Sequence, residues 1–256
     1  MATEPGVLVT RPAGQADALL EALAGAGLRA VHQPLLTLEP LPELAPQARQ
    51  AVIDLDRYQH VIFVSANAVH FGMELIGNYW PQLPVGLAWY GVGVTTATLL
   101  REFGLDPISP PLQMDSEGLL AMESLQQVAG DRVLIVKGIG GRGKIAEVLA
   151  QRGAQVDELP CYRRYCPTLV PGQLAATLGQ ESINVVLISS GEGLENMLSL
   201  LSAAETTKFR DIELIVPSPR VAALAQQAGF PRVMTADNAS DAAMLEALRR
   251  WRAGDK

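Results

Sequence analysis

The sequence predicts an α/β protein of two similar domains, each with a parallel, flavodoxin-like sheet of about five strands flanked by helices. Short apolar runs of strand length alternate along the chain with segments whose apolar residues have helical spacing. Residues 6–38 also align without a gap with residues 132–164, which indicates a duplicated block. The length of 256 residues is sufficient for two domains of modest size.

The internal repeat involves three kinds of unit, and the same order of units occurs twice along the chain. The aligned starts are Gly6 with Arg132, His60 with Asn184, and Tyr90 with Ile215. A fixed period over a few supersecondary units indicates that one domain was duplicated.

Apolar runs give the expected strands in order. These strands are residues 7–10, 30–34, 61–64, 87–91, 107–109, 133–136, 156–162, 185–189, 213–216 and 232–235. Helices are expected between them; the first opens at Arg11 and Pro12, and the last covers residues 241–251.

Two proline-bearing segments are expected to connect the domains. One includes Pro40 and Pro42, and the other includes Pro167 and Pro171. The order of the repeated units then predicts a discontinuous domain one, residues 1–36 plus 168–256. Domain two, residues 41–163, is inserted in it, and residues 37–40 and 164–167 are the linkers.

Composition narrows the classes of function. A net charge of −7 argues against a general nucleic-acid-binding protein. No apolar run is long enough to cross a bilayer, and the first residues, MATEPG, lack the features of a signal peptide, so we expect a soluble cytoplasmic protein. The two cysteines and three histidines have no metal-ligand spacing, so neither a metal site nor a disulfide framework is expected.

Small and polar residues follow the predicted strands at matching positions of both repeats. In parallel sheets, ligands bind beyond the carboxyl ends of the strands. Backbone N–H groups at helix N-termini, with hydroxyls and a few cations, favour carboxylate or phosphate ligands. The candidate binding residues are Thr10, Arg11, Ser65, Ala66, Asn67, Gly93, Thr95, Thr96, Lys137, Gly138, Gly140, Arg142, Ser190, Gly191, Ser218 and Arg220. Each of these loops is also compatible with an ordinary helix cap.

One loop suggests a different ligand. Gly138, Gly140 and Gly143 fit the G-x-G-x-x-G pattern of dinucleotide-binding loops, with Asp157 and Glu158 downstream. A P-loop is not predicted, because isoleucine follows the lysine where magnesium needs a hydroxyl. The alternatives at this point are a nucleotide-dependent oxidoreductase, a non-catalytic two-domain protein that clamps a small anion, and a tight turn without a ligand.

Several segments together resemble the uroporphyrinogen-III synthase family. They are TRP at residues 10–12, the segment from Ile62, YGVGVTTATLL from Tyr90, VLIVKGIGGRGKIAEVLAQRGAQV from Val133, CYRR at residues 161–164 and ISSGEGLENML from Ile188. The resemblance spans essentially the whole chain. It implies two α/β domains joined by a two-stranded linker, which agrees with the two proline-bearing connections.

The resemblance also implies a reaction. Linear hydroxymethylbilane would be closed into uroporphyrinogen III, with loss of water and inversion of ring D through a spiro intermediate. No cofactor is expected, and the protein is expected to be a monomer that binds no nucleic acid and no membrane. A transient contact with the bilane-producing enzyme is left open. The substrate would fold between the two domains, where the protein mainly dictates geometry.

Tyr162, in CYRR, occupies the position of a tyrosine in this family. A phenol keeps its proton at neutral pH, so Tyr162 is the candidate donor to the departing hydroxyl. The alternative is a partly buried strand tyrosine with a hydrogen-bonded hydroxyl. The cysteine that precedes it replaces a valine of the family pattern and leaves the phenol unaffected.

Overall fold

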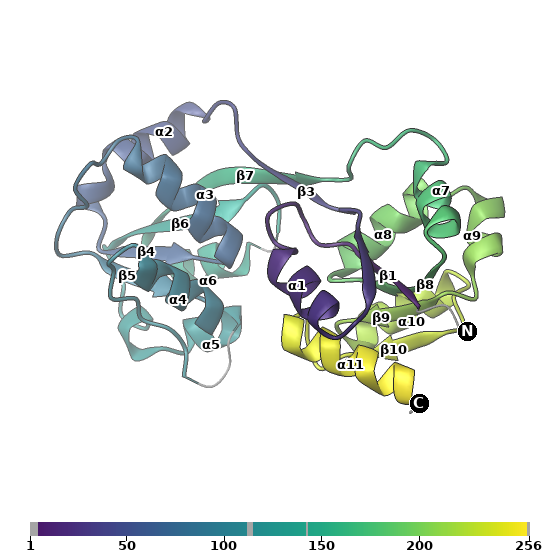
Figure 1. Ribbon diagram of the computed structural model, residues 1–256. Helices are drawn as coiled ribbons and strands as arrows, with labels where there is room; N and C mark the ends of the chain where they lie inside the picture. Colours follow the sequence, from purple (N-terminus) through teal and green to yellow (C-terminus); the bar gives the residue numbers. More distant parts are fainter. Residues whose placement is uncertain (1–4, 112–114, 142, 255–256) are drawn as a thin grey trace. The chain divides into compact units, whose positions relative to one another are not determined.

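The structure is a computed structural model that describes residues 5–111, 115–141 and 143–254. The chain divides into two compact units (Figure 1). Unit 1 comprises Met1–Leu38 and Tyr165–Lys256, and unit 2 comprises Glu39–Arg164. Each unit contains a five-stranded sheet flanked by helices, so the predicted fold class is confirmed. Within the part of the chain that the structure describes, no helix is long and apolar enough to cross a membrane.

Unit 1 has the flavodoxin-like strand order. Its elements are β1 (Gly6–Val9), α1 (Asp17–Gly25), β2 (Arg29–His32), α7 (Gln173–Gln180), β8 (Ile183–Leu187), α8 (Gly191–Leu200), α9 (Ala203–Phe209), β9 (Glu213–Val216), α10 (Pro219–Gln227), β10 (Val233–Thr235) and α11 (Asp241–Ala253). The sheet order is β10-β9-β8-β1-β2, with parallel neighbours throughout. Numbered along unit 1, this is the 2-1-3-4-5 order.

Alternate residues of the unit 1 strands enter two separate cores. Val7 and Val9 face α1 and α11, whereas Leu8 lies in the core beneath α7, α8 and α10. Both faces of β1 are therefore buried, and all four of its residues have apolar or no side chains. A central parallel strand is covered by helices on both faces, which explains the continuous apolar run.

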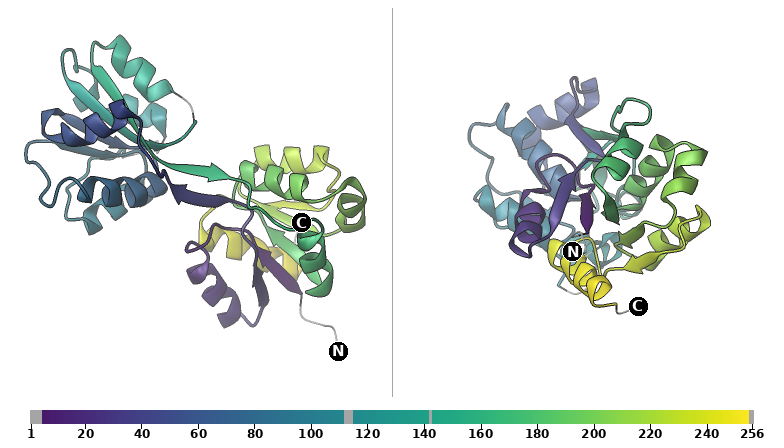
Figure 2. Two further views of the ribbon diagram at one scale, coloured as in Figure 1. Left: turned by 90° about the horizontal axis from the view of Figure 1, so that it is seen from above. Right: turned by 45° about the vertical axis from the view of Figure 1, so that its right-hand side comes forward.

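Unit 2 has the corresponding arrangement. Its elements are β3 (Thr37–Pro40), α2 (Pro46–Ile53), a 3-10 turn η1 (Leu55–Arg57), β4 (His60–Phe63), α3 (Ala66–Gly77), β5 (Ala88–Gly91), α4 (Val94–Glu102), α5 (Ser116–Leu120), a 3-10 turn η2 (Glu123–Leu125), β6 (Arg132–Gly138), α6 (Lys144–Gln151) and β7 (Gln155–Tyr165). The sheet order is β3-β7-β6-β4-β5, and β3 lies beside β7 (Figure 2). Ile62, Val133 and Ile135 pack against α5 and α6, while α3 contacts β6 from the other face.

The strand orders agree with the internal repeat, because β9-β8-β1-β2 corresponds to β5-β4-β6-β7. The alignment of the segment from His60 with the segment from Asn184 has to be shifted by one residue. Val7 pairs with Val185 in unit 1, and its counterpart Val133 pairs with His60 in unit 2. His60 is therefore equivalent to Val185 rather than to Asn184, and a register irregularity next to Val7 accounts for the shift.

Two local predictions were wrong. Helix α1 begins at Asp17 rather than at Arg11 and Pro12, because a turn closed by Gln15 N–H and Pro12 O precedes it. The expected strand at residues 107–109 forms only an isolated bridge between Ile108 and Tyr90. The fifth strand is instead β3, in the proline-bearing connection; proline is tolerated there because β3 is an edge strand.

Candidate active site

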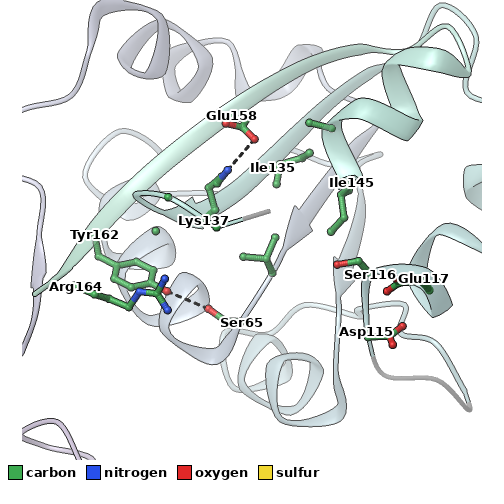
Figure 3. Close-up of a pocket in the computed structure, with 15 residues that line it drawn as sticks. Ser65, Asp115, Ser116, Glu117, Ile135, Lys137, Ile145, Glu158, Tyr162 and Arg164 are labelled. Atoms are coloured by element: carbon green, nitrogen blue, oxygen red, sulfur yellow. Dashed lines mark hydrogen bonds and ion pairs between the residues drawn. The ribbon is translucent and has the colours of Figure 1, made fainter. Parts of the chain in front are cut away.

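A pocket of about 400 Å³ lies within unit 2 at the carboxyl ends of β4 and β6. These two strands flank the point where the strand order reverses, which is where ligands bind in open α/β sheets. The polar lining of the pocket, shown in Figure 3, consists of Ser65, Asp115, Ser116, Glu117, Lys137, Glu158, Tyr162 and Arg164. Ile135 and Ile145 form part of the apolar wall.

Tyr162 is placed in the pocket by a bulge near the end of β7. Lys137 pairs with Pro160, but the next residue, Gly138, pairs with Tyr162, so Cys161 is the extra residue. Bulges of this kind re-aim side chains and are common beside active sites. Backbone N–H of Ile139 donates to Tyr162 O at 2.8 Å and fixes the strand beyond the bulge.

The ring of Tyr162 is held on several sides and is only 4% exposed. Phe71 of α3 stacks on it, with ring centroids 5.1 Å apart and an interplanar angle of 19°. Gly138 lies so close that a Cβ atom there would be 2.6 Å from Tyr162 Cζ. The phenol therefore has a defined position, as a group that transfers a proton requires.

Ser65 approaches the phenol from the start of α3. Its Oγ lies 3.4 Å from Tyr162 Oη and accepts a 3.1 Å hydrogen bond from Ala68 N–H, so it is the N-cap of the helix. The hydroxyl thus connects the phenol to a helix N-terminus, which carries a partial positive charge.

Acidic and basic side chains form ion pairs along the pocket wall. Lys137 Nζ lies 2.9 Å from Glu158 Oε1; the lysine side chain is 13% exposed and the glutamate 40%. Across the pocket, Lys144 pairs with Glu117 at 2.5 Å. The hydrogen bond from Lys144 holds the pKa of the Glu117 carboxyl below its usual value. Asp115 caps α5 by accepting from Gly118 N–H.

Cys161 does not supply a nucleophile. Its side chain is buried, with Sγ 3.3 Å from Lys137 O. Burial raises the pKa of the thiol to about 12, so it stays protonated at neutral pH.

The pocket brings together five of the residues predicted from sequence, namely Ser65, Lys137, Gly138, Gly140 and Tyr162. Ala66 and Asn67 belong to the first turn of α3 and do not line the pocket. At the start of α4, after β5, the N-cap is Gly93 and the first turn includes Thr95 and Thr96. The prediction for Arg142 lies outside the described residues.

The remaining candidates lie in unit 1 at the corresponding strand ends. Thr10 Oγ1 donates to Leu187 O at 2.7 Å, which joins the ends of β1 and β8. Arg11 forms a 2.6 Å ion pair with Asp241. Ser190 and Ser218 are the N-caps of α8 and α10, and the Arg220 guanidinium lies beside Gly191, where a Cβ atom would be 3.4 Å from it.

Several lining residues were not identified from sequence. Asp115 carried a recognisable helix-capping pattern, but nothing placed it near Tyr162. Arg164 is part of the CYRR segment, but no role was predicted for it. Phe71 contacts Tyr162 without being a lining residue, and it had no signal of its own, because this contact depends on how a helix faces the ring. Glu158 was noted only as a possible ribose ligand, and the structure pairs it with Lys137.

The geometry argues against the dinucleotide alternative. Asp157 accepts hydrogen bonds from Tyr58 at 2.7 Å and from Arg132 at 3.2 Å. It pairs with Leu134 near the start of the β6–β7 ladder, whereas a ribose-binding acid is needed at the carboxyl end. Among the described residues, no group of three or more histidine, cysteine, aspartate or glutamate side chains is arranged to hold a metal ion.

Comparison with known proteins gives a consistent result. The family described as "Uroporphyrinogen-III synthase HemD" matches residues 17–246. Uroporphyrinogen-III synthase of Escherichia coli K12 is 33% identical over 95% of this chain and 99% of its own length. That of Synechococcus elongatus is 31% identical, over 77% of this chain and 75% of its own.

Solved structures agree at the level of fold. A mutant uroporphyrinogen III synthase from Thermus thermophilus has a TM-score of 0.65 at 17% identity, covering 98% of this chain and 99% of that one. The enzyme from Helicobacter pylori has a TM-score of 0.61 at 16% identity, covering 97% and 100%. The family match and the 33% identity over nearly the full length together show that this chain belongs to the uroporphyrinogen-III synthase family.

Proposed function

We propose that this chain closes linear hydroxymethylbilane into uroporphyrinogen III, with loss of water and inversion of ring D, in tetrapyrrole biosynthesis. The observation that carries the proposal is the family match over residues 17–246. The buried phenol in the unit 2 pocket supports the assignment of its chemistry.

Tyr162 is the proposed proton donor. The phenol proton moves to the hydroxyl of the hydroxymethyl group and the carbon–oxygen bond breaks, which gives water, an azafulvenium cation that keeps its pyrrole N–H, and the phenolate of Tyr162. Ring D attacks through its substituted carbon to give a spiro intermediate, which fragments and recloses. The proton lost from a ring carbon at the end restores the phenol, so the net change is the loss of one water molecule.

Positioning accounts for the selectivity. The substrate also cyclises unaided, to the unwanted isomer, so the protein has to favour one geometry over another. The proposed contacts to its carboxylates include Lys137 in the unit 2 pocket and, within unit 1, Arg220 beside Gly191. Backbone N–H groups at helix N-termini suit these anions. We further propose that the protein acts as a monomer, since one chain carries all of these residues, and that it acts in the cytoplasm.

The test is isomer analysis. Purified protein is incubated with enzymatically generated hydroxymethylbilane, the products are oxidised, and the type I and type III isomers are separated. We expect an excess of type III that grows with protein concentration. Equal isomer ratios with and without the protein would contradict the proposed function.

Glu158 is expected to compete with the substrate for Lys137. Glu158→Gln keeps the shape of the side chain and removes its charge, which leaves the mostly buried ammonium free to bind a substrate carboxylate. Partly exposed ion pairs contribute about 0.2–1 kcal/mol, so KM should fall by up to roughly fivefold with little change in kcat.

The matched control is Glu74→Gln, which removes the same charge from an exposed position on α3 that does not line the pocket. It corrects for the change in net charge of the protein. An equal decrease of KM in both variants, or an increase of KM in Glu158→Gln alone, would show that Glu158 does not compete with the substrate for Lys137.

A further inference from the structure

The hydroxyl of Ser65 has one hydrogen and two lone pairs to place. One lone pair accepts from Ala68 N–H at 3.1 Å, which holds the oxygen in position at the start of α3. The phenol oxygen of Tyr162 lies 3.4 Å away, on the side that faces the pocket (Figure 3). The serine hydrogen can therefore turn towards the phenol without breaking the helix cap.

We propose that Ser65 is a positioning residue that stabilises the phenolate formed when Tyr162 gives up its proton. This inference rests on the proposed function. In the step concerned, the phenol O–H bond breaks, its proton goes to the departing hydroxyl, and the electron pair stays on the phenol oxygen. The Ser65 O–H bond does not break; it donates a hydrogen bond to the new anion.

The hydrogen bond from Ser65 stabilises the transition state more than it stabilises the complex with bound substrate. Hydrogen bonds to an ionised oxygen are shorter and about twice as strong as neutral ones. The 3.4 Å contact is long for two neutral hydroxyls, so it contributes little before the proton leaves. Only an interaction that strengthens as charge develops raises kcat.

Helix α3 adds to the same effect in two ways. It spans twelve residues, and its N-terminus, which Ser65 caps, carries partial positive charge that favours an anion nearby. Phe71, on the same helix, stacks on the ring of Tyr162. The element that supplies the hydrogen-bond donor therefore also fixes the ring that receives it.

A double-mutant cycle tests the inference. Ser65→Ala is expected to lower kcat for type III product by about tenfold or more with little change in KM. Ser65→Thr keeps both the hydroxyl and the helix cap, so it should recover most of the activity. In a Tyr162→Phe background, Ser65→Ala should cause no further loss, because Ser65 acts through the phenol.

Loss of the helix cap is controlled separately. Ser240 caps α11 by accepting from Ala243 N–H, and Ser240→Ala should lower the melting temperature by a few degrees, as Ser65→Ala does, without changing kcat. Losses of Ser65→Ala and Tyr162→Phe that multiply in the double variant would overturn the inference, as would an unchanged kcat in Ser65→Ala. Full activity of Tyr162→Phe would overturn it while leaving the synthase function intact, whereas no excess of type III from the unaltered protein would end the proposed function itself.

Discussion

Tyr162→Phe is expected to lower the turnover of hydroxymethylbilane to uroporphyrinogen III by about 10²–10⁴-fold, the usual range for loss of a general acid. The substitution removes the phenol oxygen and keeps the ring. The stack on Phe71 and the close contact with Gly138 remain, so the site keeps its shape. The hydrogen bond lost to Ser65 contributes at most about 1 kcal/mol to stability.

Initial rates of type III formation measure this effect, and the circular dichroism spectrum and the urea midpoint confirm the fold. Tyr79→Phe is a suitable control, because Tyr79 is also in unit 2, is 41% exposed and does not line the pocket. Turnover of Tyr162→Phe close to that of the unaltered protein would remove the phenol from the proposed mechanism.

Gly138→Ala is expected to lower both activity and stability. The added methyl group would lie 2.6 Å from Tyr162 Cζ and within 3.0 Å of two further ring atoms, so the ring or the strand has to move. Moving the ring breaks the stack on Phe71 and moves the phenol away from Ser65. Overpacking of this kind costs about 1–3 kcal/mol, and a displacement of about 1 Å at a catalytic group can reduce turnover about 100-fold.

Urea unfolding and turnover are compared with those of Gly77→Ala. Gly77 ends α3 in the same unit, and a Cβ atom there would meet nothing within 4 Å, so this control should be neutral or slightly stabilising. Unchanged stability and turnover in Gly138→Ala would mean that the ring of Tyr162 is not confined as the structure describes.

Much of the fold could be predicted because parallel strands buried on both faces leave continuous apolar runs in the sequence. The four residues of β1 and the apolar run within β6 are examples. The edges of the sheets were predicted less well. Residues 107–109 form only a short segment, and whether it pairs depends on the neighbouring chain rather than on its own residues. Conversely, β3 contains a proline and forms an edge strand.

The candidate site also contains residues that could be predicted from the sequence and residues that could not. Ser65 and Lys137 could be found because residues at the carboxyl ends of parallel strands gather at one edge of a sheet. Tyr162 was identified in another way, from the resemblance of CYRR to a segment of the family. Phe71 could not be found, because its role depends on the rotation of α3 about its axis. The bulge at Cys161 was also invisible, although it decides that Tyr162 lies opposite Gly138.

The discontinuity of unit 1 has a consequence for synthesis on the ribosome. Strand β1 occupies the middle of its sheet between β2 and β8, and Thr10 contacts a partner 177 residues later in the chain. Unit 2 is made from one continuous segment, and it can fold while β8 is still being translated. In the nascent chain, β1 therefore lacks its partner β8 until the whole of unit 2 has been made, and we expect its apolar residues to be accessible to chaperones during that interval.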